Sequence, residues 1–307
     1  MMKKTMAGFL GAALLWGALA GCGTGAPVST DSPDDIPMPT QSAPPADYVY
    51  NADAIDSYTR TYIQPDPALY QQAFDGVEQF ESTVPLGEQT YTEEQVAAVA
   101  AAVFSRYEFD YLNGMRLSKD GKNLEIFYLD GYTAETATTT RDAFRRKVQY
   151  ILSDVADPEK TDVENAQAVY RYFAKATYNE NAKNAGCYGI MVSGEGICTG
   201  YAYAMRYIFD QLGIPSHLAF SKDQSHVWNV VELDGKWYHL DATWESIRQD
   251  ETPQLYYFGM TDQRRGMDFD GWYGGGHSDY DTFELPPCTD GRFQSLWDTG
   301  KAEGSNP

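Results

Sequence analysis

An Asp-Gly pair between two β-rich runs is the feature that most restricts how this chain can fold. Residues 226–233 (His-Val-Trp-Asn-Val-Val-Glu-Leu) and 236–241 (Lys-Trp-Tyr-His-Leu-Asp) lie on either side of Asp234-Gly235. Asp-Gly is a strong signal for a two-residue turn between antiparallel strands. The pattern therefore predicts a hairpin in which Leu233 pairs with Lys236.

That register places a histidine and an aspartate on one face of the hairpin. Continued from the turn, the pairing puts Trp228 opposite Asp241, and His226 lies two residues before Trp228. Side chains alternate between the faces of a strand, so His226 and Asp241 become diagonal neighbours with Cβ atoms roughly 7 Å apart. A slip of one residue would send them to opposite faces. We expect the carboxylate to reach the imidazole.

A cysteine is predicted to begin the helix that precedes this hairpin. Cys198 follows Gly194 and Gly196, which permit a close backbone approach, and Gly213 with Pro215 marks the end of the helix. Apolar residues recur between them at helical spacing: Ala202, Met205, Phe209 and Leu212. The unpaired amides and dipole of a helix N-terminus favour a thiolate. The alternative is a buried structural cysteine, the commoner fate of a lone cysteine.

Cys198, His226 and Asp241 together have the residue types of a nucleophilic triad. A thiolate needs a base beside it, and the base needs a third group that fixes its tautomer and stabilises its charge. Each residue alone has an ordinary explanation, as a core cysteine, a hydrogen-bonded strand histidine or a turn-forming aspartate. Spacing and register leave open whether Cys198 approaches the hairpin.

The N-terminus has the features of an export signal. Lys3 and Lys4 precede an apolar run, residues 9–20, which is too short for a membrane-spanning helix. The run closes on Leu19-Ala20-Gly21-Cys22, which resembles a bacterial lipobox. We expect an exported protein held on the outer face of the bacterial cytoplasmic membrane by a lipid on Cys22, its only membrane attachment. The alternative is ordinary cleavage near Ala20, with Cys22 unmodified.

Composition shifts divide the rest of the chain. Residues 23–47 hold six of the fifteen prolines and are expected to form a disordered tether between the signal peptide, residues 1–22, and the folded part. Residues 48–157 alternate helical and strand patterns and predict an N-terminal α+β region, either a scaffold or a substrate-binding platform. Residues 158–290 form the domain that carries the three candidate residues, and residues 291–307 form a C-terminal tail.

Charge and metal-ligand spacing exclude several classes of partner. The formal charge of −21 repels nucleic acid and anionic lipid headgroups. The four histidines show no metal-ligand spacing and no EF-hand loop is present, so neither a metal nor another cofactor is expected. Besides Cys22, the chain has Cys187, Cys198 and Cys288, an odd number that suggests one free thiol. The sequence leaves open whether Cys187 and Cys288 form a disulfide.

Several motifs around the candidate residues resemble the core of bacterial transglutaminase-like proteins. The resemblance covers about residues 185–245 closely, and more loosely reaches from Tyr178 to a strand at 256–258 and to Cys288. The motifs that carry it are Gly196-Ile197-Cys198-x-Gly200-Tyr201-Ala202, Leu212-Gly213-Ile214, His226-Val227-Trp228-Asn229-x-Val231 and Gly235-Lys236-Trp237-Tyr238-x-x-Asp241-x-Thr243-Trp244. It implies an α+β, papain-like fold, in which a nucleophile helix packs against an antiparallel sheet.

The resemblance also implies roles for individual residues. Cys198 would be the nucleophile, His226 the general base and acid, and Asp241 the orienting carboxylate. Supporting residues would be Trp228, Asn229 and Trp244. The chain departs from the family pattern at Thr199, where a larger polar residue is common, and at residues 220–225, which lack a glycine before the histidine. The second oxyanion donor is unassigned, with Tyr188 a candidate from position alone and aromatic packing its competing explanation.

The chemistry implied is attack of a thiolate on an amide carbonyl, which forms a thioester acyl-enzyme. Water would resolve the thioester as hydrolysis, and an amine would resolve it as transfer. We expect an extracytoplasmic cysteine-dependent peptidase, amidase or acyl transferase that acts on protein or peptide, with cell-wall peptide as one candidate. Because a fold does not fix a function, the alternative is a catalytically silent transglutaminase-like binding module at the cell envelope.

Overall fold

A five-stranded antiparallel sheet forms the centre of the C-terminal half. The computed structural model describes residues 50–51, 63–275 and 282–298. The strand order is β10-β9-β6-β7-β8, and every neighbouring pair is antiparallel. The bounds are β6 Ser216–Ser221, β7 Val227–Leu233, β8 Lys236–Leu240, β9 Trp272–Gly275 and β10 Thr282–Phe283.

The hairpin of β7 and β8 has the predicted register. Leu233 pairs with Lys236, and the same pairing continues to Asn229 and Leu240 at the far end. Asp234 and Gly235 both have positive φ, at 51° and 72°. A two-residue turn with positive φ at both central positions matches the twist of the flanking strands, which is why Asp-Gly suits it. The prediction of this hairpin is confirmed.

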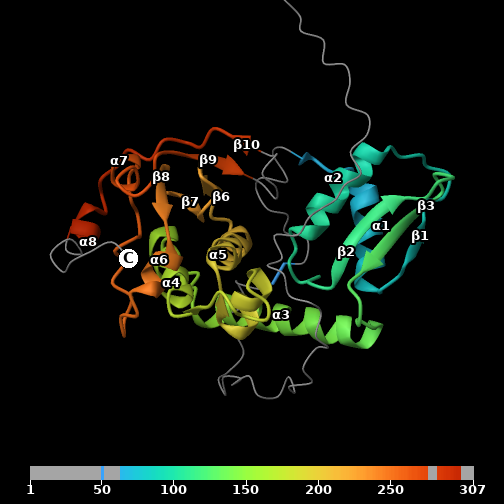
Figure 1. Ribbon diagram of the computed structural model, residues 1–307, viewed down its shortest axis with the longest axis horizontal. Helices are drawn as coiled ribbons and strands as arrows, with labels where there is room; N and C mark the ends of the chain where they lie inside the picture. Colours follow the sequence, from blue (N-terminus) through green and yellow to red (C-terminus); the bar gives the residue numbers. More distant parts are fainter. Residues whose placement is uncertain (1–49, 52–62, 276–281, 299–307) are drawn as a thin grey trace, which may run out of the picture. The chain divides into compact units, whose positions relative to one another are not determined.

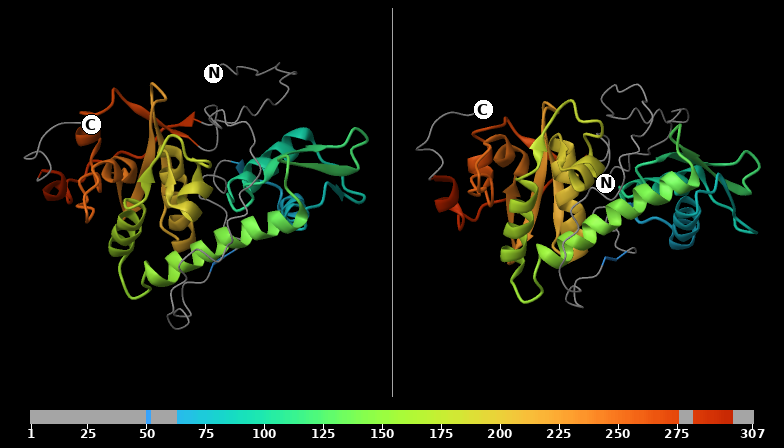
Figure 2. Two further views of the ribbon diagram at one scale, coloured as in Figure 1. Left: turned by 60° about the horizontal axis from the view of Figure 1, so that its bottom comes forward. Right: turned by 90° about the horizontal axis from the view of Figure 1, so that it is seen from below.

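Helix α5, Cys198–Leu212, packs against β6 and β7 of this sheet (Figure 1). It begins and ends at the predicted residues, and Gly213 closes it in the left-handed conformation at φ 74°. Three further helices contact α5: α3 (Ala134–Asp154), the long helix of Figure 2, α4 (Asp162–Phe173) and α6 (Ala242–Ile247). The α+β fold with a helix on an antiparallel sheet is therefore present, as expected.

Short elements connect these helices to the sheet. A two-residue parallel pair, β4 (Thr177–Tyr178) with β5 (Glu195–Gly196), and the π-helix η3 (Gly189–Ser193) lead into α5. Two short helices, α7 (Asp262–Arg265) and α8 (Gln294–Asp298), lie near the end of the described chain. The core around α5 includes Phe144, Tyr170 and Phe209, all fully or almost fully buried. Phe144 belongs to α3, so α3 contributes to this core.

A second, three-stranded sheet belongs to the N-terminal region. Its order is β1-β3-β2, with β1 Thr83–Pro85, β2 Leu112–Leu117 and β3 Asn123–Tyr128. Helices α1 (Pro67–Glu78) and α2 (Glu93–Phe104) pack on each other and on this sheet (Figure 1). They enclose a separate core that includes Leu69, Val99 and Leu124. Capping boxes at Thr92 and Thr161 begin α2 and α4.

One expected strand is absent, and several boundaries remain predictions. Residues 256–258 form a turn, while Met260 makes the isolated bridge to His239 of β8. Residues 1–22 and the tether, residues 23–47, lie outside the described residues. The described elements lie in one unit, Asp31–Pro307, and the predicted division at residue 157 stays a prediction. No helix in the described part has the length and apolar content needed to cross a membrane.

Gly200→Ala is expected to lower the free energy of unfolding by about 1–3 kcal/mol because of overpacking. The added Cβ would lie 2.7 Å from the carbonyl oxygens of both Ala185 and Gly186. Without this close approach, alanine would stabilise the helix relative to glycine by about 1 kcal/mol. The sign of the change in the free energy of unfolding therefore tests whether the backbones approach so closely. Urea denaturation measures it, with Gly114→Ala as the control because nothing lies within 4 Å of that position. A variant as stable as the parent would contradict the prediction.

Candidate active site

Cys198 is the first residue of α5, and a close backbone approach holds it there. The preceding residue, Ile197, donates its backbone N–H to the carbonyl of Ala185 at 3.0 Å. A Cβ on Gly196 would lie 2.6 Å from that same carbonyl oxygen, so only glycine permits the approach. Ile197 provides no side-chain cap for the helix. Cys198 is partly exposed at this helix start, where backbone amides favour a negative charge.

A buried asparagine joins α5, the helix that begins at Cys198, to the hairpin. Asn229 of β7 is 1% exposed, and its side-chain Nδ2 donates to the carbonyl of Ala202, in the first turns of α5, at 2.9 Å. Cys198 packs beside Ala202 and Val227 in a small apolar cluster. This is the approach of Cys198 to the hairpin that spacing alone left open.

His226 and Asp241 form a buried hydrogen-bonded pair. Nε2 of His226 lies 2.7 Å from Oδ2 of Asp241, as the register predicts. Asp241 follows the last residue of β8 and caps α6, and its Oδ1 accepts the Trp244 backbone N–H at 3.2 Å. Tyr170 of α4 donates its hydroxyl to the Asp241 carbonyl at 3.0 Å. The carboxylate is thus fixed by side-chain and backbone contacts together.

Both members of this pair have strongly shifted pKa values. Burial opposes a charge on His226, but the Asp241 carboxylate and the Cys198 side chain together raise its pKa to about 9. Burial also opposes a charge on Asp241, yet His226 and Arg265 bring its pKa down to about 2. Since Nε2 faces Asp241, the ring nitrogen left for the sulfur is Nδ1. The geometry suits a protonated imidazole between the Asp241 carboxylate and the Cys198 sulfur.

The comparison with family models identifies this part of the chain. Residues 149–242 match the Transglutaminase-like superfamily. This segment is similar to a transglutaminase-like core. A comparison with curated proteins gives no match.

Two solved structures are similar to parts of the chain. One is a candidate cysteine protease from Cytophaga hutchinsonii, 17% identical, with a TM-score of 0.23 over 26% of this chain and 30% of that one. The other is described as a TGase, 14% identical, with a TM-score of 0.28 over 52% of this chain and 49% of that one. The chain therefore spans half or less of each structure.

Arg265 reaches the same site and was not expected from the sequence. Its Nη2 lies 2.6 Å from Oδ2 of Asp241, and Phe269 stacks on the His226 ring at 5.6 Å between centroids. Both residues follow the transglutaminase-like motifs in the sequence. A charged Arg264-Arg265 pair is usually a solvated surface feature, and no local pattern marks its second member as buried.

Two tyrosines bear on the unassigned oxyanion donor. Tyr188 donates its hydroxyl to the carbonyl of Thr140 at 3.4 Å and stacks on Phe144, which supports the packing explanation for it. Tyr178, in contrast, interacts electrostatically with Cys198. Burial and the charge of Cys198 raise its pKa to about 12, so its hydroxyl keeps its proton at neutral pH. In this structure that hydroxyl donates to Glu180 at 3.2 Å.

The other two described cysteines are free and buried. Cys187 packs in the core around α5 and Cys288 in a separate cluster beside Trp228. The bridge that the sequence left open is therefore not formed. Burial raises the pKa of both thiols, so they remain protonated and unreactive at neutral pH.

His239, Asp262 and Cys288 bring three potential metal ligands within 4.8 Å of one another. The Trp228 indole N–H donates to Nδ1 of His239 at 2.9 Å, so the ring proton of a neutral His239 sits on Nε2. Nε2 lies 2.9 Å from Asp262, which accepts that proton's hydrogen bond. Burial lowers the pKa of His239 and raises that of Cys288. A hydrogen-bonded network around a neutral His239 and a protonated Cys288 fits these contacts better than a metal centre.

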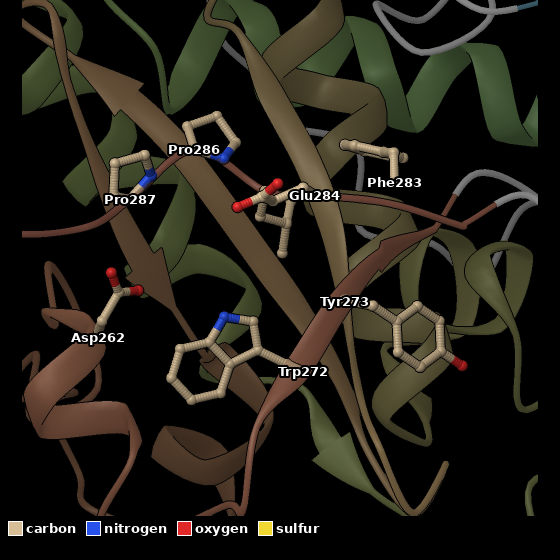
Figure 3. A pocket seen from close by; sticks show the side chains of 8 residues that line it. Asp262, Trp272, Tyr273, Phe283, Glu284, Pro286 and Pro287 are labelled. Atoms are coloured by element: carbon tan, nitrogen blue, oxygen red, sulfur yellow. The ribbon is translucent and has the colours of Figure 1, made fainter. Parts of the chain in front are cut away.

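A pocket of about 340 Å³ lies at the β9–β10 edge of the sheet (Figure 3). Its lining is aromatic and acidic, and consists of Asp262, Trp272, Tyr273, Phe283, Glu284, Leu285, Pro286 and Pro287. Cys198, His226 and Asp241 are not among these residues. The pocket meets the transglutaminase-like core through Trp272, whose ring packs edge-on against Trp228.

We expect the His226 imidazole to titrate near pH 9 in the folded protein, above its ordinary value of 6.5. Proton NMR of the ring can follow the titration. Asp241→Asn should lower the midpoint by at least about one unit, because the carboxylate is the principal group that raises it. Asp262→Asn, which alters the contact of His239, serves as the control. A midpoint near 6.5 in the parent protein would contradict the prediction.

The pKa shifts of His226 and Asp241 determine how the free energy of unfolding changes with pH. Because the folded pKa of His226 is raised, its stabilisation is complete below about pH 6.5 and is lost as the pH rises through about 9. The pKa of Asp241 is depressed, so its stabilisation is present above about pH 3.8 and is lost as the pH falls towards about 2.

Proposed function

We propose that the protein is a cysteine-dependent amide-bond enzyme, a peptidase, amidase or acyl transferase. Cys198 is the nucleophile, His226 the general base and acid, and Asp241 the residue that orients His226. The observation that carries the proposal is the buried 2.7 Å contact between His226 and Asp241, with Cys198 interacting with the same imidazole. The match of this segment to the transglutaminase-like superfamily supports a cysteine-dependent enzyme.

The proposed reaction follows from the positions of these groups. The Cys198 thiolate attacks the amide carbonyl carbon, and the carbon–nitrogen bond breaks as the His226 imidazolium gives its proton to the leaving amine. This leaves a thioester on Cys198. Water or a second amine then attacks the thioester while His226 removes the proton of the attacking group. The carbon–sulfur bond breaks, which releases the acid or the new amide and regenerates the Cys198 thiolate. The backbone N–H of Cys198 at the start of α5 is one oxyanion donor, and the Tyr178 hydroxyl is the candidate for a second.

Trapping of the acyl-enzyme tests this proposal. The purified protein is incubated with casein peptides, quenched in acid and mapped by mass spectrometry. We expect an acyl adduct on Cys198 that hydroxylamine removes, and a loss of amide turnover of roughly 10³-fold or more in Cys198→Ala. Cys187→Ala should keep both the acyl adduct on Cys198 and the amide turnover, since the thiol of Cys187 is buried in the core. Dansylcadaverine added during turnover separates transfer from hydrolysis.

Unchanged amide turnover in Cys198→Ala would refute the enzyme and favour a silent binding module at the cell envelope. That alternative predicts no adduct on Cys198 with any peptide. The casein peptides stand in for a protein or peptide substrate. Peptidoglycan fragments, tested in parallel, would identify cell-wall peptide as the preferred class.

We also propose that the enzyme is exported and lipid-anchored through Cys22. The basic start, apolar run and Leu-Ala-Gly-Cys sequence support this compartment. Cells that express the protein and are fed an alkyne fatty acid should label it, and Cys22→Ala should abolish the label. Cys288→Ala is the matched control, because that thiol is buried. Labelling that persists in Cys22→Ala would contradict the anchor.

A further inference from the structure

One oxygen of Asp241 receives two cationic groups. Oδ2 lies 2.7 Å from Nε2 of His226 and 2.6 Å from Nη2 of Arg265. The side chains of Arg265 and Asp241 are both fully buried, at 0% exposure. A guanidinium out of water costs several kcal/mol unless it is closely paired. Its position against this one oxygen therefore needs an explanation.

Aromatic rings surround the two cations together. The guanidinium carbon of Arg265 lies 4.2 Å from the ring centroid of Trp228, and 4.6 Å from those of Trp244 and Phe269. The same three rings stack on the His226 imidazole, with centroids 5.5–5.8 Å apart. Faces of aromatic rings attract cations, most strongly where water is excluded. Arg265 and His226 thus share one aromatic box around one carboxylate.

Charges of alternating sign extend from the site through Arg265. Beyond Arg265, Asp268 lies 3.4 Å from its Nη1, and Arg264 pairs with Asp268 at 2.7 Å. The other titratable groups that interact with Asp241 or Arg265 are Tyr170, Tyr257 and His239. Burial keeps the two tyrosines protonated and His239 neutral, so Arg265 and His226 supply the positive charge against Asp241.

We propose that Arg265 is a positioning residue for the triad: it holds Oδ2 of Asp241 against His226 and keeps that carboxylate ionised, and so maintains the Cys198 thiolate–His226 imidazolium pair. The proposal rests on the proposed function, because it assigns Arg265 a part in activating Cys198. Without Arg265 the buried carboxylate loses one of the two cations that depress its pKa, and one of its side-chain contacts.

The reactivity of Cys198 towards iodoacetamide measures this pair without a substrate. Near pH 6 an ordinary thiol is protonated, so fast alkylation there requires the ion pair. Near pH 9.5 the thiol ionises unaided, so the rate there reports access alone. Peptide mass spectrometry assigns the modification to Cys198.

For Arg265→Met we expect the rate near pH 6 to fall about tenfold while the rate near pH 9.5 stays within about twofold. Arg264→Met is the matched control, one residue away and paired with Asp268, and should match the parent at both values. Arg265→Met added to Asp241→Asn should change the rate near pH 6 by less than about twofold, because Arg265 acts through Asp241.

A parent-like rate near pH 6 in Arg265→Met would overturn the proposal. An equal fall at both pH values would also overturn it, since that outcome indicates a structural role. Should Arg265→Met not fold, Arg265→Lys keeps a buried cation but loses the planar fork. A fall near pH 6 of about threefold is then expected, and a parent-like rate overturns the proposal.

The proposed function fails in a different way. If Cys198 of the parent protein alkylates near pH 6 no faster than the thiol of the urea-unfolded chain, the ion pair does not exist, whatever the variants do. If the parent is fast and Arg265→Met is equally fast, the triad stands and only the role of Arg265 is lost.

Discussion

The burial of the Asp241 carboxylate is the constraint on which the site depends. An ionised carboxylate out of water is tolerated only where donors surround it. Here His226 and Arg265 meet one oxygen, and the backbone of Trp244 meets the other. These donors come from the start of β7, from α7 and from α6, so the elements must meet at one point. The same requirement fixes the orientation of the imidazole beside Cys198.

Cys198 reaches this point by two contacts of another kind. The glycine at position 196 lets the loop before α5 touch the backbone at Ala185, and Asn229 anchors the first turns of α5 to β7. Neither contact involves a reacting group. Close packing at a glycine and one satisfied amide position the sulfur of Cys198, while charge pairing positions the imidazole of His226.

The sequence predicts the part of the site whose geometry is local. Asp234-Gly235 sets the hairpin register, and period-two alternation then puts His226 and Asp241 together. The limits of α5 follow from helical spacing and Gly213. Arg265 could not be predicted in this way, because its burial depends on packing against Trp228 and Trp244, which are distant from it in the sequence. The expected strand at 256–258 failed for a related reason, since there the backbone turns and only Met260 pairs with β8.

The separation of these contacts along the chain has a consequence for the order of folding. The His226–Asp241 contact closes 15 residues and Asn229–Ala202 closes 27, whereas the hydroxyl of Tyr170 meets the Asp241 carbonyl across 71 residues. Short loops close at a lower entropic cost than long ones, and contacts distant in sequence slow folding. The hairpin can therefore form early with His226 and Asp241 already adjacent, and Cys198 joins them only when α5 docks. Until that docking, Cys198 lies apart from the His226–Asp241 pair.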